Sequence, residues 1–109
     1  MATFDDFLQL DMRVGEIVAV EDFPRARNPS YKIKVNFGGD IGEKWSSAQA
    51  AHYPREELMG RQVIAVVNFA PKNIAGFMSE CLILGVPDAE GKVSLLTTTR
   101  PAPIGGRVY

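Results

Sequence analysis

The alternation of residues between Tyr31 and Phe37 constrains the fold more than any other feature of this chain. Apolar residues occupy every second position of the segment, and Lys32, Lys34 and Asn36 occupy the positions between them. Successive side chains of a β-strand point to opposite faces of its sheet, so the pattern predicts a strand. One face of that strand enters a core, and the other is cationic and faces water.

Further strands are predicted on both sides of this one. Residues that favour strands are concentrated in four segments, 12–23, 62–69, 81–86 and 92–97, and a weaker pattern covers 44–49. Gly15 interrupts the first segment. A glycine inside a strand often marks a bulge or a sharp bend, as at the corner of a barrel.

Two short helices are predicted from the residues at their ends. Thr3 followed by Asp6 has the form of a helix start, with a hydroxyl cap and an acid in the first turn. The segment 54–59 begins with proline and is followed by Gly60, which is the usual asymmetry of helix ends. The first helix would be about two turns long, so it must pack on this core or on a second subunit.

These elements predict an all-β fold, a five-stranded OB-fold barrel with a short helix between strands three and four. Short N- and C-terminal extensions, residues 1–10 and 98–109, flank the barrel. An SH3-like barrel is the alternative, but it leaves the helix at 54–59 unexplained. We find no repeat or linker, so residues 1–109 form a single domain with a core of about 8–97.

Charge and cysteine content limit the class of protein. The net charge is −1, but residues 25–72 carry eight basic and four acidic side chains, which permits a local site for an anionic ligand. The one cysteine, Cys81, cannot form an internal disulfide, which favours a reducing cytoplasm. No apolar run approaches the ~18 residues that span a bilayer, and the acidic N-terminus is unlike a signal peptide.

Motifs of catalysis are missing from the sequence. His52 is the only histidine, and Ser46 and Ser47 lie outside a G-x-S-x-G elbow. No set of Cys and His residues has the spacing of a zinc site, and no glycine-rich phosphate loop is present. We therefore expect no enzyme activity, no cofactor and no metal. An enzyme of unknown class would rest on His52 and the two serines alone.

The pattern favours binding of a polar polymer instead. Lys32 and Lys34 share one strand face, and Trp45 begins the next strand, which places an aromatic ring near these cations. Single-stranded or looped RNA uses such surfaces. A polar loop after the buried strand 63–67 holds amides, a lysine, a hydroxyl and a carboxylate. Ser79 and Glu80 of this loop could equally anchor its backbone.

Four motifs in order resemble those of the tRNA-binding domain, which is appended to several aminoacyl-tRNA synthetases and also occurs alone. These are D-M-R-V-G-E-I (11–17), P-R-E-E-L-M-G-R-Q-V (54–63), V-V-N-F-A-P-K-N-I-A-G (66–76) and M-S-E-C-L-I-L-G (78–85). The remaining segments, such as K-W-S-S-A-Q and the tail R-P-A-P-I-G-G-R-V-Y, are similar to those of the small CsaA-like members. That group is described as OB-fold homodimers, export-related chaperones that bind tRNA.

The resemblance implies positions for an RNA surface and a dimer contact. Its RNA-facing residues would be Lys32, Ser47, Gln49, Asn68, Lys72, Ser79 and Glu80, together with Arg13 and Arg61. Its homodimer would use the terminal segments 1–10 and 98–109 through Phe4, Phe7, Leu8, Ile104 and Val108. The expected partner is tRNA. No membrane-spanning segment is expected.

A chaperone that holds unfolded or pre-export polypeptides is the alternative function. Such a protein needs an exposed apolar patch or groove. The candidate residues are Trp45, Phe69, Phe77 and Met78, with the terminal segments at a dimer seam. High salt would discriminate the two functions, because RNA binding weakens with salt whereas apolar binding persists.

Overall fold

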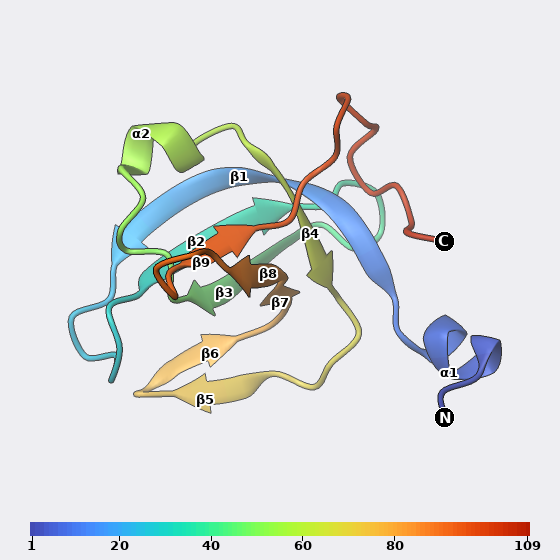
Figure 1. The fold of residues 1–109 in the computed structure, drawn as a ribbon, viewed down its shortest axis with the longest axis horizontal. Coiled ribbons are helices and arrows are strands. Elements are labelled where there is room, and N and C mark those ends of the chain that lie inside the picture. The colour runs from blue at the N-terminus through green and yellow to red at the C-terminus, as the bar shows by residue number, and fades with distance from the viewer.

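A computed structural model describes all residues, 1–109, and forms a small antiparallel β-barrel (Figure 1). The barrel sheet has the order β3-β2-β1-β4-β7, and two separate hairpins complete the fold. Its strands are β1 (Met12–Asp22), β2 (Tyr31–Asn36), β3 (Glu43–Ala48), β4 (Gln62–Val66) and β7 (Leu82–Ile83). The hairpins are β5 (Lys72–Ile74) with β6 (Phe77–Ser79), and β8 (Gly85–Pro87) with β9 (Val93–Leu95). The OB-fold prediction is confirmed.

Both predicted helices are present, and neither is long and apolar enough to cross a lipid bilayer. Helix α1 (Phe4–Gln9) starts at Thr3, whose hydroxyl and the Asp6 carboxylate form the expected reciprocal cap. Helix α2 (Arg55–Leu58) lies between β3 and β4, and its Leu58 is fully buried in the core.

Gly15 lies where β1 changes partners. The strand pairs with β4 through its first half and with β2 through its second half, and Glu16 has a partner in both. A Cβ atom at Gly15 would lie 2.3 Å from Cγ1 of Val35 and 2.8 Å from the Phe37 ring. Only glycine lets β1 pack this closely against Val35 and Phe37, whereas the register shift of β1 lies further along, between Ile17 and Ala19.

The core follows the predicted alternation of β2. Ile33, Val35 and Phe37 are buried, whereas Lys32 and Lys34 lie on the outer face. The β4 residues Val63 and Ala65 pack against this face of β2 within a single apolar cluster. The barrel interior is therefore filled with side chains, and any binding must use its outside.

The prediction of a polar loop at 68–80 is wrong, because part of this segment forms the β5–β6 hairpin. Ala75 and Gly76 make its two-residue turn with φ of 49° and 85°, and the side chain of Asn73 accepts a hydrogen bond from the Gly76 N–H at 2.9 Å. The predicted strand 81–86 is likewise divided between β7 and β8, which lie in different sheets.

Side chains close the barrel where β3 would otherwise have a free edge. The Glu80 carboxylate accepts a hydrogen bond from the Trp45 N–H at 2.9 Å, and the Glu80 N–H donates to the Trp45 carbonyl at 2.7 Å. The Ser79 hydroxyl accepts from the Ser47 N–H at 3.3 Å and donates to the Cys81 carbonyl. Ser79 and Glu80 therefore stand in for strand pairing between β3 and the segment after β6.

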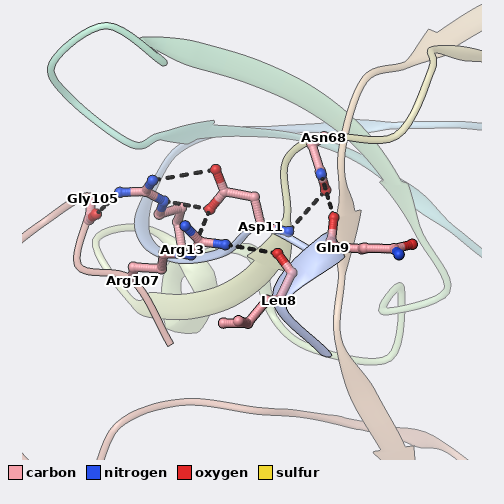
Figure 2. Close-up of polar contacts among 7 residues, drawn as sticks. All are labelled: Leu8, Gln9, Asp11, Arg13, Asn68, Gly105 and Arg107. Carbon is pink, nitrogen blue, oxygen red and sulfur yellow. Dashed lines mark hydrogen bonds and ion pairs between the residues drawn. The ribbon is translucent and has the colours of Figure 1, made fainter. Parts of the chain in front are cut away.

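A polar clasp of Asp11, Arg13, Asn68 and Arg107 joins both chain ends to the barrel (Figure 2). The Asp11 carboxylate binds Arg13 and lies 3.7 Å from Arg107, which donates to the Leu8 carbonyl. The Asn68 amide accepts from the Asp11 N–H and donates to the carbonyl of Gln9 in α1. The clasp fixes α1 in a projecting position although none of its side chains is buried.

We predict that Gly15→Ala destabilises the fold by about 1–3 kcal/mol, because the added methyl group overlaps two buried side chains. Chemical denaturation would measure the change in the free energy of unfolding. A variant as stable as the parent would contradict the close packing of Val35 and Phe37 against Gly15.

We also predict that Asp11→Asn speeds amide exchange in α1 at neutral pH, while Asp40→Asn in the exposed β2–β3 turn leaves it unchanged. The hydrogen bond from Arg13 holds the pKa of the Asp11 carboxyl below its ordinary value of 3.8. A depressed pKa means that the clasp is intact above 3.8 and is lost as pH falls through the lower folded-state value. Parent protein that loses α1 protection already at pH 6 would contradict this account.

Candidate nucleic-acid interface

A row of polar side chains crosses four strands on the outside of the barrel. Lys32 of β2 lies opposite Ser47 of β3, whose N–H donates to the hydroxyl of Ser79 in β6. Ser79 lies opposite Lys72 of β5. The structure thus brings together four residues that the sequence analysis assigned to an RNA surface, and we call these four the polar row.

The two lysines at the ends of the polar row keep free positive charges. Neither Lys32 nor Lys72 belongs to any of the four ion pairs of the structure. Lys34, which shares the outer face of β2, is instead held 3.0 Å from Glu43. Glu21 faces Lys32 across the β1–β2 register without forming an ion pair. The row can therefore offer two cations to an anionic polymer.

Aromatic rings support the lysine at one end of the row. The Lys32 Nζ lies 5.2 Å from the ring centroids of both Phe23 and Phe77, and Lys34 lies 5.6 Å from that of Trp45. Phe77 contacts the other two rings edge-on, with centroids 5.4 and 6.0 Å apart. These rings hold the cation in place, which confirms that an aromatic residue lies near the strand lysines.

The sequence analysis missed two residues of this surface, Phe23 and Arg25. A small hollow of about 200 Å³ next to Lys32 is lined by Phe23, Arg25 and the β5–β6 turn. Arg25 lies near that turn, because its guanidinium is 3.8 Å from where a Cβ of Gly76 would stand. The signal that could have found it is the arginine pair in the P-R-A-R-N-P loop, which follows Phe23 directly.

Other predicted RNA-facing residues lie elsewhere. Gln49 borders a separate hollow of about 490 Å³ that also contains His52 and Lys92. Arg61 is exposed and lies 5.8 Å from the Tyr53 ring. Arg13 and Asn68 have their polar atoms engaged in the clasp. Their predicted contact with RNA stays a prediction.

The candidate apolar residues do not form one patch. Phe69 and Met78 are about half exposed, at 47% and 48%, whereas Trp45 and Phe77 are half-buried against each other. Phe69 borders a hollow of about 380 Å³ under the β5–β6 hairpin, and Phe77 borders the smaller one beside Lys32.

The groups considered for catalysis are occupied or buried. The Nε2 atom of His52 contacts the carbonyl of Val93 at 2.9 Å, and Ser46 is completely buried. Burial raises the pKa of the Cys81 thiol to about 12. The thiol is therefore protonated at neutral pH and is a poor nucleophile.

Comparisons with known proteins show which family the chain resembles. The family described as "Putative tRNA binding domain" matches residues 12–107. The methionine–tRNA ligase of Pyrococcus furiosus is 36% identical over 106 residues, which are 97% of this chain and 14% of the ligase. This chain therefore spans about one seventh of that curated relative.

Two solved structures match over the full length of this chain. The CsaA chaperone protein from Picrophilus torridus is 47% identical with a TM-score of 0.95, and the match covers 100% of both chains. The chaperone CsaA from Bacillus anthracis str. Ames is also 47% identical, with a TM-score of 0.90 over 99% of its chain. The barrel, its hairpins and the extent of the family match lead to one conclusion: the chain belongs to the tRNA-binding domain family.

Proposed function

We propose that this protein binds tRNA across the polar row through contacts to phosphates and to the shape of the folded RNA. The observation that carries the proposal is the meeting of Lys32, Ser47, Ser79 and Lys72 on one face, with neither lysine held in an ion pair. Contacts to phosphates position a protein on nucleic acid and carry little sequence information. Binding should therefore extend to many tRNAs.

The local charge supports this proposal more than the total charge does. The whole chain has a net charge of −1, which gives no long-range attraction to RNA. Arg25 adds a third cation beside Lys32 and the hairpin turn. Counterion release from the contacted phosphates would supply the affinity, so binding should weaken as salt rises.

We further propose that the protein acts by binding alone, in a reducing cytoplasm. No base lies within hydrogen-bonding reach of the buried Ser46 hydroxyl, which donates to the Ser47 carbonyl at 3.5 Å. The single thiol of Cys81 has no partner for an internal disulfide, which suits a reducing compartment.

A homodimer through the terminal segments is part of the proposal. Helix α1 has no buried side chain, and its Phe4 and Leu8 are 71% and 46% exposed, while Ile104 in the tail is 39% exposed. Phe7 and Val108 are half-buried. A six-residue helix is marginal alone, yet the clasp holds α1 out from the barrel. A second copy of the chain is the cover that we propose for these apolar side chains.

A chaperone function is the second candidate, and it is favoured because both similar CsaA proteins are described as chaperones. The half-exposed Phe69 and Met78 would contact an unfolded or pre-export polypeptide. Such apolar contacts would persist in high salt, unlike the phosphate contacts proposed for tRNA.

We predict that the double variant Lys32→Gln/Lys72→Gln binds tRNA at least about tenfold more weakly, because each lysine supplies a charge-assisted hydrogen bond to a phosphate. Glutamine avoids placing a second carboxylate opposite Glu21. Fluorescence anisotropy with labelled tRNA would measure the dissociation constant.

The matched control is Lys92→Gln/Arg100→Gln, which removes the same charge from exposed positions away from the polar row. It should bind tRNA almost as tightly as the parent. Equal losses in both double variants would mean that only net charge matters, and this would reject the polar row as the binding site.

We predict that Phe4→Ser/Leu8→Ser yields a folded monomer, because the change removes the apolar face of α1 that a second copy would cover. Sedimentation velocity would measure the mass in solution. Met59→Ser changes a similarly exposed apolar side chain, 48% exposed, beside α2, and should keep the mass of the parent. A parent that already sediments as a monomer would refute the dimer.

A further inference from the structure

The hollow under the β5–β6 hairpin is the feature of this surface that phosphate binding leaves unused. It has a volume of about 380 Å³, which lies within the usual range of small-ligand sites of about 300–1,000 Å³. Ser47, Lys72 and Ser79 of the polar row border it, so the hollow is continuous with the surface proposed for RNA.

The walls of this hollow are apolar and accessible. Phe69 and Leu82 are 47% and 46% exposed, and Ile74 lies beside them. Unpaired RNA bases are commonly held against aromatic and apolar side chains of this kind. Lys72 at the rim is exposed and unpaired, so it could hold the phosphate of a nucleotide whose base enters the hollow.

Glu80 lines the same hollow and keeps one acceptor atom free. Its Oε1 atom accepts the Trp45 N–H, whereas its Oε2 atom makes no hydrogen bond or ion pair within the protein. Every buried polar side-chain atom has a partner, so the unpartnered Oε2 must reach solvent. The neighbouring Ser79 hydroxyl is already engaged as both acceptor and donor. Glu80 is thus a charged side chain with a hydrogen-bonded position and an unused acceptor, and it lies near the unpartnered hydroxyl of Ser47.

We propose that this hollow takes one unstacked base of the bound RNA, and that Glu80 selects bases with an exocyclic amino group. This inference rests on the proposed RNA-binding function and adds a base preference to it. Carboxylates accept hydrogen bonds from the amino group of cytosine. Uracil has carbonyl oxygens on both sides of its N3–H, and these would face the negative Oε2 atom.

Charge favours a nucleotide over a peptide side chain in this hollow. An apolar side chain would leave the Glu80 carboxylate beside it without a partner, and a cationic one would meet Lys72 at the rim. A nucleotide satisfies both groups, because its phosphate pairs with the lysine while its amino group pairs with the carboxylate.

The test compares short single-stranded oligo(C) and oligo(U) of equal length in an anisotropy titration with the parent and with Glu80→Gln. The parent should bind oligo(C) about fivefold or more tightly than oligo(U). Glutamine keeps an oxygen for the Trp45 N–H and presents an amide donor to the hollow. The preference should therefore disappear or reverse toward oligo(U), with an unchanged unfolding midpoint.

Two further variants keep the test decisive if Glu80→Gln folds poorly. Phe69→Ala, at an exposed position, should weaken binding of both oligomers about fivefold or more through lost stacking. Met59→Ala, at a similarly exposed apolar position beside α2, should change neither the affinity nor the preference.

The outcomes separate this inference from the proposed function. Salt-sensitive tRNA binding with equal affinity for oligo(C) and oligo(U) would overturn base selection and leave tRNA binding in place. Failure of the parent protein to bind any RNA would overturn both base selection and tRNA binding. Competition for the hollow by an unfolded polypeptide, without any oligonucleotide preference, would assign the site to the chaperone function instead.

Discussion

The hydrogen bonds between β3 and the Ser79–Glu80 segment are the constraint on which the rest of this surface depends. They close the barrel through two side chains that accept from β3 and one backbone hydrogen bond, where the other strands pair through backbone hydrogen bonds. This closure holds the β5–β6 hairpin against β3 and so brings Lys72 into line with Lys32. The polar row and the hollow beneath the hairpin are both consequences of that attachment, because each has one wall on the barrel and one on the hairpin.

Pairing decides which charges remain available for a ligand. Lys34 is held by Glu43 and Arg13 by Asp11, so these cations serve the fold. Lys32 and Lys72 have no such partner, and the aromatic rings below Lys32 restrain it without neutralising it. A chain with a small net negative charge can in this way present a cationic site of limited extent. Recognition would then depend on where phosphates lie and less on general attraction.

The sequence predicted the barrel because its signals are local. The alternation in β2, the glycine in β1 and the helix cap at Thr3 each occur within a few residues. The β5–β6 hairpin escaped prediction because its strands have three residues each and its turn places alanine at positive φ. The sequence analysis allowed for a structural role of Glu80, but the partners of Asn68 and Glu80 could not be predicted, since they lie 57 and 35 residues away. Residue type alone does not distinguish a residue that binds RNA from one that holds two segments of the fold together.

The dependence of tRNA affinity on salt tests the central claim most directly. Binding of labelled tRNA to the parent protein would be measured over a series of salt concentrations. If the two free lysines of the polar row contact phosphates, the logarithm of the association constant should fall linearly with the logarithm of salt, with a slope of about −2 for each protomer that engages the RNA. An affinity that does not change with salt, or no measurable binding at low salt, would contradict the account.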